Sequence, residues 1–268
     1  MLDLNQFKAF LFDVDRTLVN ASYQFPLGVV TIINKLYQQG FEVGICTGRS
    51  FQSVRHSVLP VFDGLNHKGY HVISGGAEAI NTQGEVFFQE PISPEVVKKL
   101  HTDVKRQGRF VAASYNTLFM DKKHLTQYQG AWDIPLASFA EYQNEPITLI
   151  DIHEVDFEDE CFKSLQDQIT IKQMTSNKGR PYVAITAKDV TKATGLKHWA
   201  QLSQINLDSV IGFGDSANDI EFLQAVGYGV AMGNAVSELK KVADEVIGSI
   251  DENGLKVYLE KLLADNKI

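Results

Sequence analysis

Residues 10–20 of the chain read FLFDVDRTLVN, and two carboxylates in this stretch, Asp13 and Asp15, come directly after an apolar run. The run over residues 8–12 has the length and composition of a buried strand. Two like charges this close repel, so the pKa of one must rise unless a cation lies between them. The stretch therefore predicts a buried strand whose carboxyl end is either solvated or holds a positive group.

The bulk composition is that of a globular chain with an acidic surface. The chain has 268 residues with 44% hydrophobic side chains, which is enough for a sizeable core and for one large or two smaller domains. Its formal net charge is -8, and such a surface repels nucleic acid and anionic membranes. We therefore expect neither of them as a partner.

Cysteine usage and the first residues favour a reducing compartment. The two cysteines, Cys46 and Cys161, lie far apart and suggest neither a disulfide framework nor a zinc motif. The stretch MLDLNQFKAF has no signal-peptide pattern, and no apolar run approaches the ~20 residues of a membrane span. We expect a cytoplasmic protein, and the sequence leaves its oligomeric state open.

Both ends of the chain alternate between strand and helix periods. In the first third, strands are expected at 8–12, 42–46 and 71–74, with a helix between Pro26 and Gly40. The last third repeats the pattern, with expected helices at 192–203, 217–225, 235–242 and 254–264 and strands at 209–213, 228–232 and 245–247. This alternation favours right-handed crossovers and a parallel sheet. It predicts a doubly wound, Rossmann-like α/β core made of residues 1–83 and 188–268.

Residues 84–187 break this alternation and are predicted to form an inserted α+β domain. The expected elements are helices at 94–107 and 157–168 and strands at 109–114, 117–120, 147–152, 169–174 and 182–186. Turn signals such as KGRP at 178–181 separate several of them.

Polar groups follow the strand signals at two further places. The segment TGRS, residues 47–50, comes after the strand at 42–46, and GDSAND, residues 214–219, comes after the strand at 209–213. Lys192 begins the helix that precedes the latter strand. In an open parallel sheet, ligands bind outside the carboxyl ends of the strands, so these groups are expected to converge on one crevice.

Taken singly, each group also has a structural explanation. The paired aspartates could be solvated, the Thr47-Gly48 pair could be a turn with a helix cap, and Lys192 could be a solvated lysine. Asp215 could cap the helix that follows it. Their joint occurrence in this order, at strand ends and helix starts, favours a functional site.

The motifs DVDRTL, TGR, a lysine before a helix, and GDSAND, in that order, resemble the four motifs of the haloacid dehalogenase (HAD) superfamily of phosphatases. The insertion, the segment FGDSANDIEFL, the downstream AMGNA and the terminal DENGLKVYLEKLL resemble its Cof-type subgroup of sugar-phosphate phosphatases. The resemblance implies a Mg²⁺-dependent phosphatase that acts on a small phosphorylated metabolite. It also implies that residues 84–187 form a cap that closes over the crevice.

The resemblance implies a role for each motif residue. Asp13 matches the nucleophile that forms an aspartyl-phosphate, and Asp15 matches the general acid/base. A Mg²⁺ held by Asp13, the backbone carbonyl of Asp15, and Asp215 would offset the carboxylate repulsion. The positions that match groups holding or orienting the phosphate are Thr47, Gly48, Lys192 and Asn218. Ser216 and Asp219 are further candidates for a contact at the metal.

The sequence departs from the family pattern at three places. Arg16 stands where the family most often has glycine, Ala193 replaces the glycine that commonly follows the lysine, and SGGA at 74–77 stands where many relatives have Asn-Asn-Gly-Ala. A long cation at position 16 could alter access to the nucleophile. The glycines at 75 and 76 could let backbone approach the substrate, or form a turn.

Two other functions stay open from the sequence. A phosphomutase or phosphotransferase of the same superfamily would return the phosphate to a sugar in place of water. A catalytically silent, ligand-binding relative would keep the fold without the chemistry. In the cap, basic residues such as Arg109, Lys178 and Arg180 are candidates for contacting the leaving group, although each could be a solvated surface residue.

Overall fold

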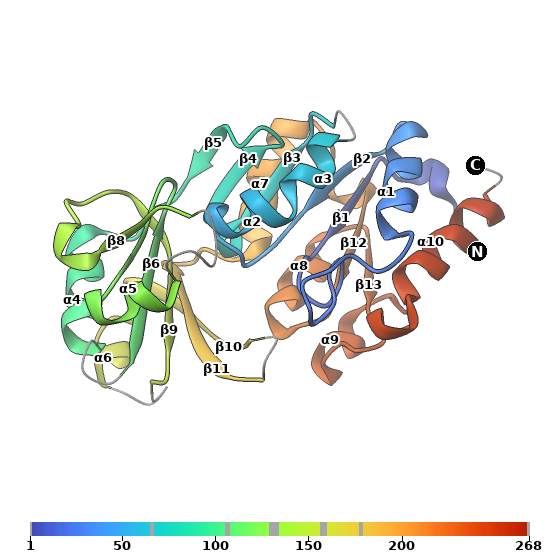
Figure 1. Ribbon diagram of the computed structural model, residues 1–268. Helices are drawn as coiled ribbons and strands as arrows, with labels where there is room; N and C mark the ends of the chain where they lie inside the picture. Colours follow the sequence, from blue (N-terminus) through green and yellow to red (C-terminus); the bar gives the residue numbers. More distant parts are fainter. Residues whose placement is uncertain are drawn as a thin grey trace.

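The computed structural model describes residues 2–64, 67–104, 108–128, 134–155, 160–176 and 179–266. Strands in these ranges form three sheets, and the two larger ones lie at opposite ends of the molecule (Figure 1). None of the helices in the described ranges is long and apolar enough to cross a membrane.

A parallel sheet ordered β14-β13-β12-β1-β2 forms the core. Its strands are β1 (Ala9–Phe12), β2 (Glu42–Ile45), β12 (Val210–Gly214), β13 (Tyr228–Ala231) and β14 (Glu245–Val246). All four residues of β1 are buried, because helices cover the sheet on both faces and leave no solvated side. The predicted doubly wound core is therefore confirmed.

Helices from both ends of the chain cover the two faces of this sheet. One face packs against α1 (Val29–Gln38), α2 (Phe51–Ser57), α3 (Leu59–Gly64) and α10 (Gly254–Asp265). The other face packs against α7 (Lys192–Ser203), α8 (Ile220–Ala225) and α9 (Ser237–Val242). The expected helix over 192–203 is confirmed, while that over 217–225 begins with a 3₁₀ turn, Ala217–Asp219. α2 and α3 were not expected from the sequence.

The expected strand at 71–74 exists but was placed in the wrong sheet. β3 (Tyr70–Ile73) pairs antiparallel with β4 (Glu78–Asn81), which pairs with β5 (Val86–Gln89), and β3 meets the core sheet at a single bridge between Cys46 and Val72.

Two buried histidines explain this separation. The backbone N–H of Val43 donates to Nε2 of His67 (3.4 Å), and the N–H of Ile45 donates to Nδ1 of His71 (3.3 Å). Imidazole nitrogens thus occupy the edge of β2 where a further parallel strand would pair.

The insertion forms a sheet ordered β10-β11-β9-β6-β7-β8. Its strands are β6 (Arg109–Ser114), β7 (Leu118–Met120), β8 (Leu136–Ser138), β9 (Ile147–His153), β10 (Ile169–Thr175) and β11 (Pro181–Ala187). Its helices are α4 (Pro94–Val104), α5 (Lys122–Tyr128) and α6 (Glu160–Lys163). One face of the sheet packs on α4 and α6, on the side away from the core (Figure 1).

The predicted elements of the insertion are largely present, with three differences. β8 and α5 were not expected from the sequence. The helix expected at 157–168 is present only as α6, with 157–159 outside the described residues. The helix expected at 94–107 is present over Pro94–Val104, and 105–107 lie outside the described residues. β5 falls inside the range predicted for the insertion, yet it pairs with β4. The boundaries at 84 and 187 stay a prediction.

Candidate active site

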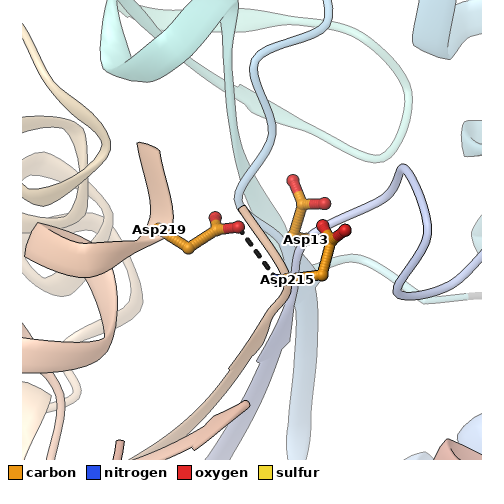
Figure 2. Close-up of side chains that lie close together, drawn as sticks. All are labelled: Asp13, Asp215 and Asp219. Carbon is orange, nitrogen blue, oxygen red and sulfur yellow. Dashed lines mark hydrogen bonds between the residues drawn. The ribbon is translucent and has the colours of Figure 1, made fainter. Parts of the chain in front are cut away.

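The two central strands bring Asp13 and Asp215 to the same edge of the core sheet. β1 and β12 are parallel neighbours with Phe12 opposite Phe213, and the N–H of Asp13 donates to the carbonyl of Phe213 (2.8 Å). Carboxylate oxygens of Asp13, Asp215 and Asp219 all lie within 4.8 Å of one another. Figure 2 shows Asp13 and Asp215 at the strand ends and Asp219 reaching toward them from the following turn.

Lys192 is the buried cation of this site. Its Nζ lies 2.6 Å from Oδ1 of Asp13 and 2.5 Å from Oδ1 of Asp219, and only 1% of the residue is exposed. Burial alone would lower its pKa, but the charges of Asp13 and Asp219 outweigh that effect and raise it. The lysine therefore stays charged and offsets the repulsion that the sequence raised as a problem.

The backbone at Gly76 lies directly against the start of α7, and this contact positions Lys192. A Cβ on Gly76 would lie 1.9 Å from the carbonyl oxygen of Thr191, which is the N-cap of α7, and Gly76 has φ 107°. No side chain fits there, so glycine at 76 lets the 74–77 turn contact the start of α7. Of the two roles considered for these glycines, Gly76 thus packs against the helix that carries Lys192.

The carboxyl groups of Asp13 and Asp215 have raised pKa values. For Asp13, burial is the main cause and Lys192 opposes it. For Asp215, burial again dominates, and the neighbouring charges of Asp13 and Asp219 add to it. Both groups therefore hold protons more tightly than ordinary carboxylates until a further cation reaches them.

Asp219 holds the loop that carries Asp215. Its Oδ2 accepts hydrogen bonds from the N–H groups of Asp215 (3.1 Å) and Ser216 (2.9 Å), and its Oδ1 accepts from Lys192. Both of its oxygens are therefore engaged, whereas Oδ1 of Asp215 accepts no hydrogen bond from a described residue. Asp219 positions the lysine and the loop.

Residues 47–49 form the opposite wall of the site. Thr47 is buried, and its Oγ1 accepts from the N–H of Arg49 (3.2 Å). The guanidinium of Arg49 binds both oxygens of Asp15, at 2.7 and 2.8 Å. Arg49 belongs to the TGR motif, and the sequence predicted no role for it. The sequence did offer a signal for this role. Arg49 is a basic residue two positions after Thr47, in a segment expected at the same sheet edge as the carboxylates of Asp13 and Asp15, which a guanidinium can bind.

Arg16 adopts a backbone conformation that favours glycine. Its φ is 62°, its carbonyl accepts from Nδ2 of Asn234 (3.0 Å), and its half-exposed side chain places Nε 3.7 Å from Oδ2 of Asp215. Glycine adopts this φ without a steric penalty, which explains why the motif usually has it here. Asn234 belongs to the AMGNA segment and fixes this loop, a role that the sequence analysis did not assign.

Two cavities lie between the polar residues at the edge of the core sheet and the insertion. A space of about 510 Å³ is lined on the core side by Asp13, Asp15, Thr47, Asp215 and their neighbours. Its wall from the insertion consists of Asp151, His153, Gln173, Met174, Thr175, Ser176 and Tyr182. A smaller space of about 30 Å³ next to it is lined by Gly48, Lys192, Asn218 and Tyr182, among others.

The structure thus brings every predicted site residue to one place. The cap residues differ from the expectation, because neither Arg109 nor Arg180 is among the described residues that line the larger cavity, and Lys178 lies outside the described residues. Asp151 and His153 alternate with apolar residues in the segment ITLIDIH, a period of two that could have marked them as one face of a strand.

Comparisons with known proteins agree with this geometry. The model of a family described as haloacid dehalogenase-like hydrolase matches residues 10–259. The phosphatase YwpJ of Bacillus subtilis is 24% identical over 293 residues, covering 96% of this chain and 100% of that protein. A phosphoglycolate phosphatase of Sulfolobus acidocaldarius is 27% identical over 258 residues, covering 94% of this chain and 95% of that protein. A solved HAD subclass IIB sugar phosphatase, 24% identical, superposes with a TM-score of 0.79 over 95% of this chain and 98% of that chain.

Proposed function

The chain belongs to the haloacid dehalogenase-like hydrolase family and is a phosphatase, and we propose that it hydrolyses phosphate monoesters of small metabolites, sugar phosphates above all, with Mg²⁺ as its cofactor. The observation that carries the proposal is the position of Asp13. Its carboxylate lies between Lys192 and Asp215 on the floor of a cavity that the insertion covers.

The proposed reaction has two steps at phosphorus. In the first, an oxygen of Asp13 attacks the phosphoryl group, the bond to the leaving oxygen breaks, and Asp15 gives that oxygen a proton. In the second, Asp15 takes a proton from water, the water oxygen attacks the aspartyl-phosphate, and inorganic phosphate leaves with Asp13 restored. Arg49 donates hydrogen bonds to both oxygens of Asp15. At least one of these hydrogen bonds must therefore break before Asp15 can carry a proton.

The donor set at the strand ends fits Mg²⁺. Asp13 and Asp215 offer hard carboxylate oxygens within 4.8 Å, and Mg²⁺ prefers a few such ligands together with water and substrate phosphate. The backbone carbonyl of Asp15 is the third proposed protein ligand. When bound, the ion would neutralise charge on the transferring phosphoryl group.

Four further residues are proposed to hold the phosphoryl group. Lys192 supplies a charged donor, and the backbone N–H of Gly48 and the side chains of Thr47 and Asn218 are polar groups beside it. Gly48, Lys192 and Asn218 line one small cavity together, which supports this assignment. All four belong to the core, so they would act on the phosphate whatever the leaving group is.

We also propose that the insertion, residues 84–187, is a cap that excludes water from the aspartyl-phosphate during transfer. Its seven cavity-lining residues face the catalytic carboxylates, which supports this role. A cytoplasmic location fits Cys46 and Cys161, which are both buried and are not joined by a disulfide.

Phosphate release from p-nitrophenyl phosphate, with and without Mg²⁺, tests the chemistry. The Asp13→Asn variant should lose at least about 10⁴-fold in turnover, because it removes the nucleophile and changes little volume. Asp265→Asn makes the same chemical change at an exposed position and should behave as the wild type.

Three outcomes would contradict parts of the proposal. Phosphate release by a clean Asp13→Asn preparation would contradict the assignment of Asp13 as the nucleophile. Phosphate release that does not depend on Mg²⁺ would contradict the assignment of Mg²⁺ as the cofactor. Transfer of phosphate to a sugar without inorganic phosphate would identify a phosphomutase in place of a phosphatase.

A further inference from the structure

A buried carboxyl group lies where the three-stranded sheet meets the core and the cap. The sheet of β3, β4 and β5 lies between the core sheet and the cap sheet (Figure 1). Glu78 is the first residue of β4, only 1% of it is exposed, and no described residue forms an ion pair with it. Burial of a carboxyl group without a cation lowers stability unless hydrogen bonds satisfy its oxygens, so its partners must explain its presence.

Three hydrogen bonds satisfy Glu78, and each comes from a different segment. Its Oε2 accepts from Oγ of Ser74 (2.5 Å), in the turn that follows β3, and from Oγ1 of Thr148 (3.0 Å), in β9 of the cap. Its Oε1 accepts from Nε2 of Gln89 (3.0 Å), in β5. One buried side chain thus connects the core turn with the cap sheet.

The turn on the core side contacts both elements that carry the proposed phosphate-binding residues. The N–H of Ser74 donates to the carbonyl of Arg49 (2.7 Å), and the next N–H in the turn donates to the carbonyl of Thr47 (3.1 Å). Two residues after Ser74, Gly76 packs against the start of α7, the helix that begins with Lys192. The position of this turn therefore affects both sides of the phosphate site.

Ser74 adopts a backbone conformation that its own side chain does not favour. Its φ is 52°, in the left-handed region, which is unfavourable for a residue with a Cβ. Such a conformation persists only where the surroundings hold it. The hydrogen bond from the Ser74 hydroxyl group to Glu78 is one of the contacts that hold it here.

On the cap side, Thr148 precedes the part of β9 that lines the cavities. Leu149 lines the smaller cavity, and Asp151 and His153 line the larger one. β9 pairs with β6 on one side and β11 on the other, so a shift at Thr148 would move this whole wall relative to the core.

We propose that Glu78 is a positioning residue of the reaction, which holds the cap sheet and the phosphate-binding turn in one arrangement through the hydroxyl groups of Thr148 and Ser74. The inference rests on the proposed phosphatase function. Glu78 is not among the described residues that line the two cavities, so it acts through others. A misplacement of about 1 Å can cost about 100-fold in rate, so a loss of alignment at this connection should be measurable.

A double-mutant cycle tests whether the two hydroxyl groups act in series. Thr148→Val removes the hydrogen bond from the cap, and Ser74→Ala removes the one from the core. Because both act through Glu78, each variant should lower kcat/KM for a hexose monophosphate about 10-fold, and the double variant should lose about 10-fold as well. A loss of about 100-fold in the double variant, the product of two independent losses, would overturn the connection.

A comparison of substrates separates positioning from a loss of stability. A variant that only folds less completely contains less active enzyme, so its kcat falls equally for every substrate and KM is unchanged. Thr148→Val should lower kcat/KM more for the hexose monophosphate than for acetyl phosphate, whose leaving group is much shorter. Equal losses on the two substrates would overturn the positioning role. Thr170→Val makes the same change in β10, away from both cavities, and should leave both substrates unchanged.

Glu78→Gln is the conservative variant. Its amide oxygen can accept from Ser74 and Thr148, and the amide of Gln89 can rotate to present its oxygen to the new N–H group. Glu78→Gln should therefore keep kcat/KM within about 3-fold of the wild type, whereas Glu78→Leu should lose about as much as the double variant. Equal losses in Glu78→Gln and Glu78→Leu would contradict a role through these hydrogen bonds.

Amide hydrogen exchange distinguishes failure of this inference from failure of the proposed function. A wild type that releases phosphate from neither substrate would contradict the phosphatase proposal. The N–H groups of Ser74 and Gly75 should still exchange about 10-fold faster in Thr148→Val than in the wild type or in Thr170→Val. Unchanged exchange at both positions in Thr148→Val would overturn the connection between the cap and the turn.

Discussion

The core sheet and the cap sheet both direct carboxyl groups into one cavity, but they surround these groups differently. In the core, Asp13 is bound by Lys192, Asp15 by Arg49, and Asp219 by the backbone of its own loop. In the cap, the Asp151 carboxyl group has no hydrogen-bonding partner among the described residues, although the charge of Arg109 acts on it, and its neighbours in register are apolar. The carboxylates of the core are therefore held by cations and backbone N–H groups of the chain itself, whereas the Asp151 carboxyl group of the cap accepts no hydrogen bond from a described residue.

This difference separates two tasks within the enzyme. Transfer of a phosphoryl group needs charges that are already fixed where the transition state develops, so that no reorganisation is needed at that moment. Recognition of a leaving group needs donors and acceptors that are still available. The comparison can be tested by removing a partner from each region and measuring stability as well as activity.

The largest effect on stability is expected from Lys192→Met. Removing the cation leaves the carboxylates of Asp13 and Asp219 buried without a partner, which should lower the free energy of unfolding by about 3–5 kcal/mol. Turnover should fall as well, because the phosphate loses a charged donor. Urea denaturation measures the first effect and phosphate release the second.

Mg²⁺ offers a control for this prediction. An added divalent cation should restore part of the lost stability of Lys192→Met, since it can replace the missing charge between the carboxylates. A loss of less than about 1 kcal/mol in the absence of metal would show that the core carboxylates do not depend on Lys192.

A smaller effect is expected from pH in the metal-free protein. The folded-state pKa values of Asp13 and Asp215 are raised from 3.8 to about 7 and about 8, chiefly by burial, so the folded state holds more protons than the unfolded state between these limits. Their contribution to stability is therefore complete at low pH and is lost as the pH rises through this window.

Mg²⁺ should reverse this dependence at the same two residues, because it binds their deprotonated forms. At one fixed Mg²⁺ concentration, the increase in Tm on adding metal should grow from about pH 6 to about pH 8. Asp215→Asn should reduce that increase at every pH. An increase in Tm that is independent of pH would contradict the assignment of these carboxyl groups as ligands.

The smallest effect, and one of opposite sign, is expected from Asp151→Asn. Near pH 8 the wild type holds a charged, half-buried carboxylate without a donor, and the amide removes that charge. Because Asp151 is partly exposed, solvent screens the effect of its charge. The free energy of unfolding should therefore stay unchanged or rise by about 1 kcal/mol in Asp151→Asn. Urea denaturation of Asp151→Asn beside Asp167→Asn, at an exposed position of the same domain, checks this.

Two results bear on that last comparison. A rise in stability together with a loss of sugar-phosphate turnover would support the view that the cap trades stability for recognition. A destabilisation of more than about 2 kcal/mol would show that Asp151 holds the cap sheet together, and the contrast between the two regions would fail.

The sequence predicted the core and the motifs well because their signals are local. An apolar run followed at once by carboxylates marks a buried strand end, as at Phe12 and Asp13, and capping and periodicity mark a helix such as α7. The parallel order then places such strand ends on one edge without any knowledge of distances. For this reason the residues of the proposed core site could be identified although they are spread over more than 200 positions.

The sequence was a poor guide where the pairing of an element depends on distant partners. β3 looked like another parallel strand, yet His67 and His71 occupy the edge of β2 that it would have joined. The helices α2 and α3 were overlooked because they are short, with seven and six residues. In the cap, basic residues were chosen by charge alone, while the cavity is lined by Asp151 and its neighbours.

The local order of residues was thus sufficient for the fold class, the family and the identity of the motif residues, because strand ends, caps and periodicity are properties of short segments. Only the tertiary structure decided which charges meet. Asp15 faces Arg49, Lys192 faces both Asp13 and Asp219, and Asp151 faces the cavity, and each of these arrangements arises from elements that are distant in sequence. Electrostatic interactions depend on distance and burial, and both are set by packing.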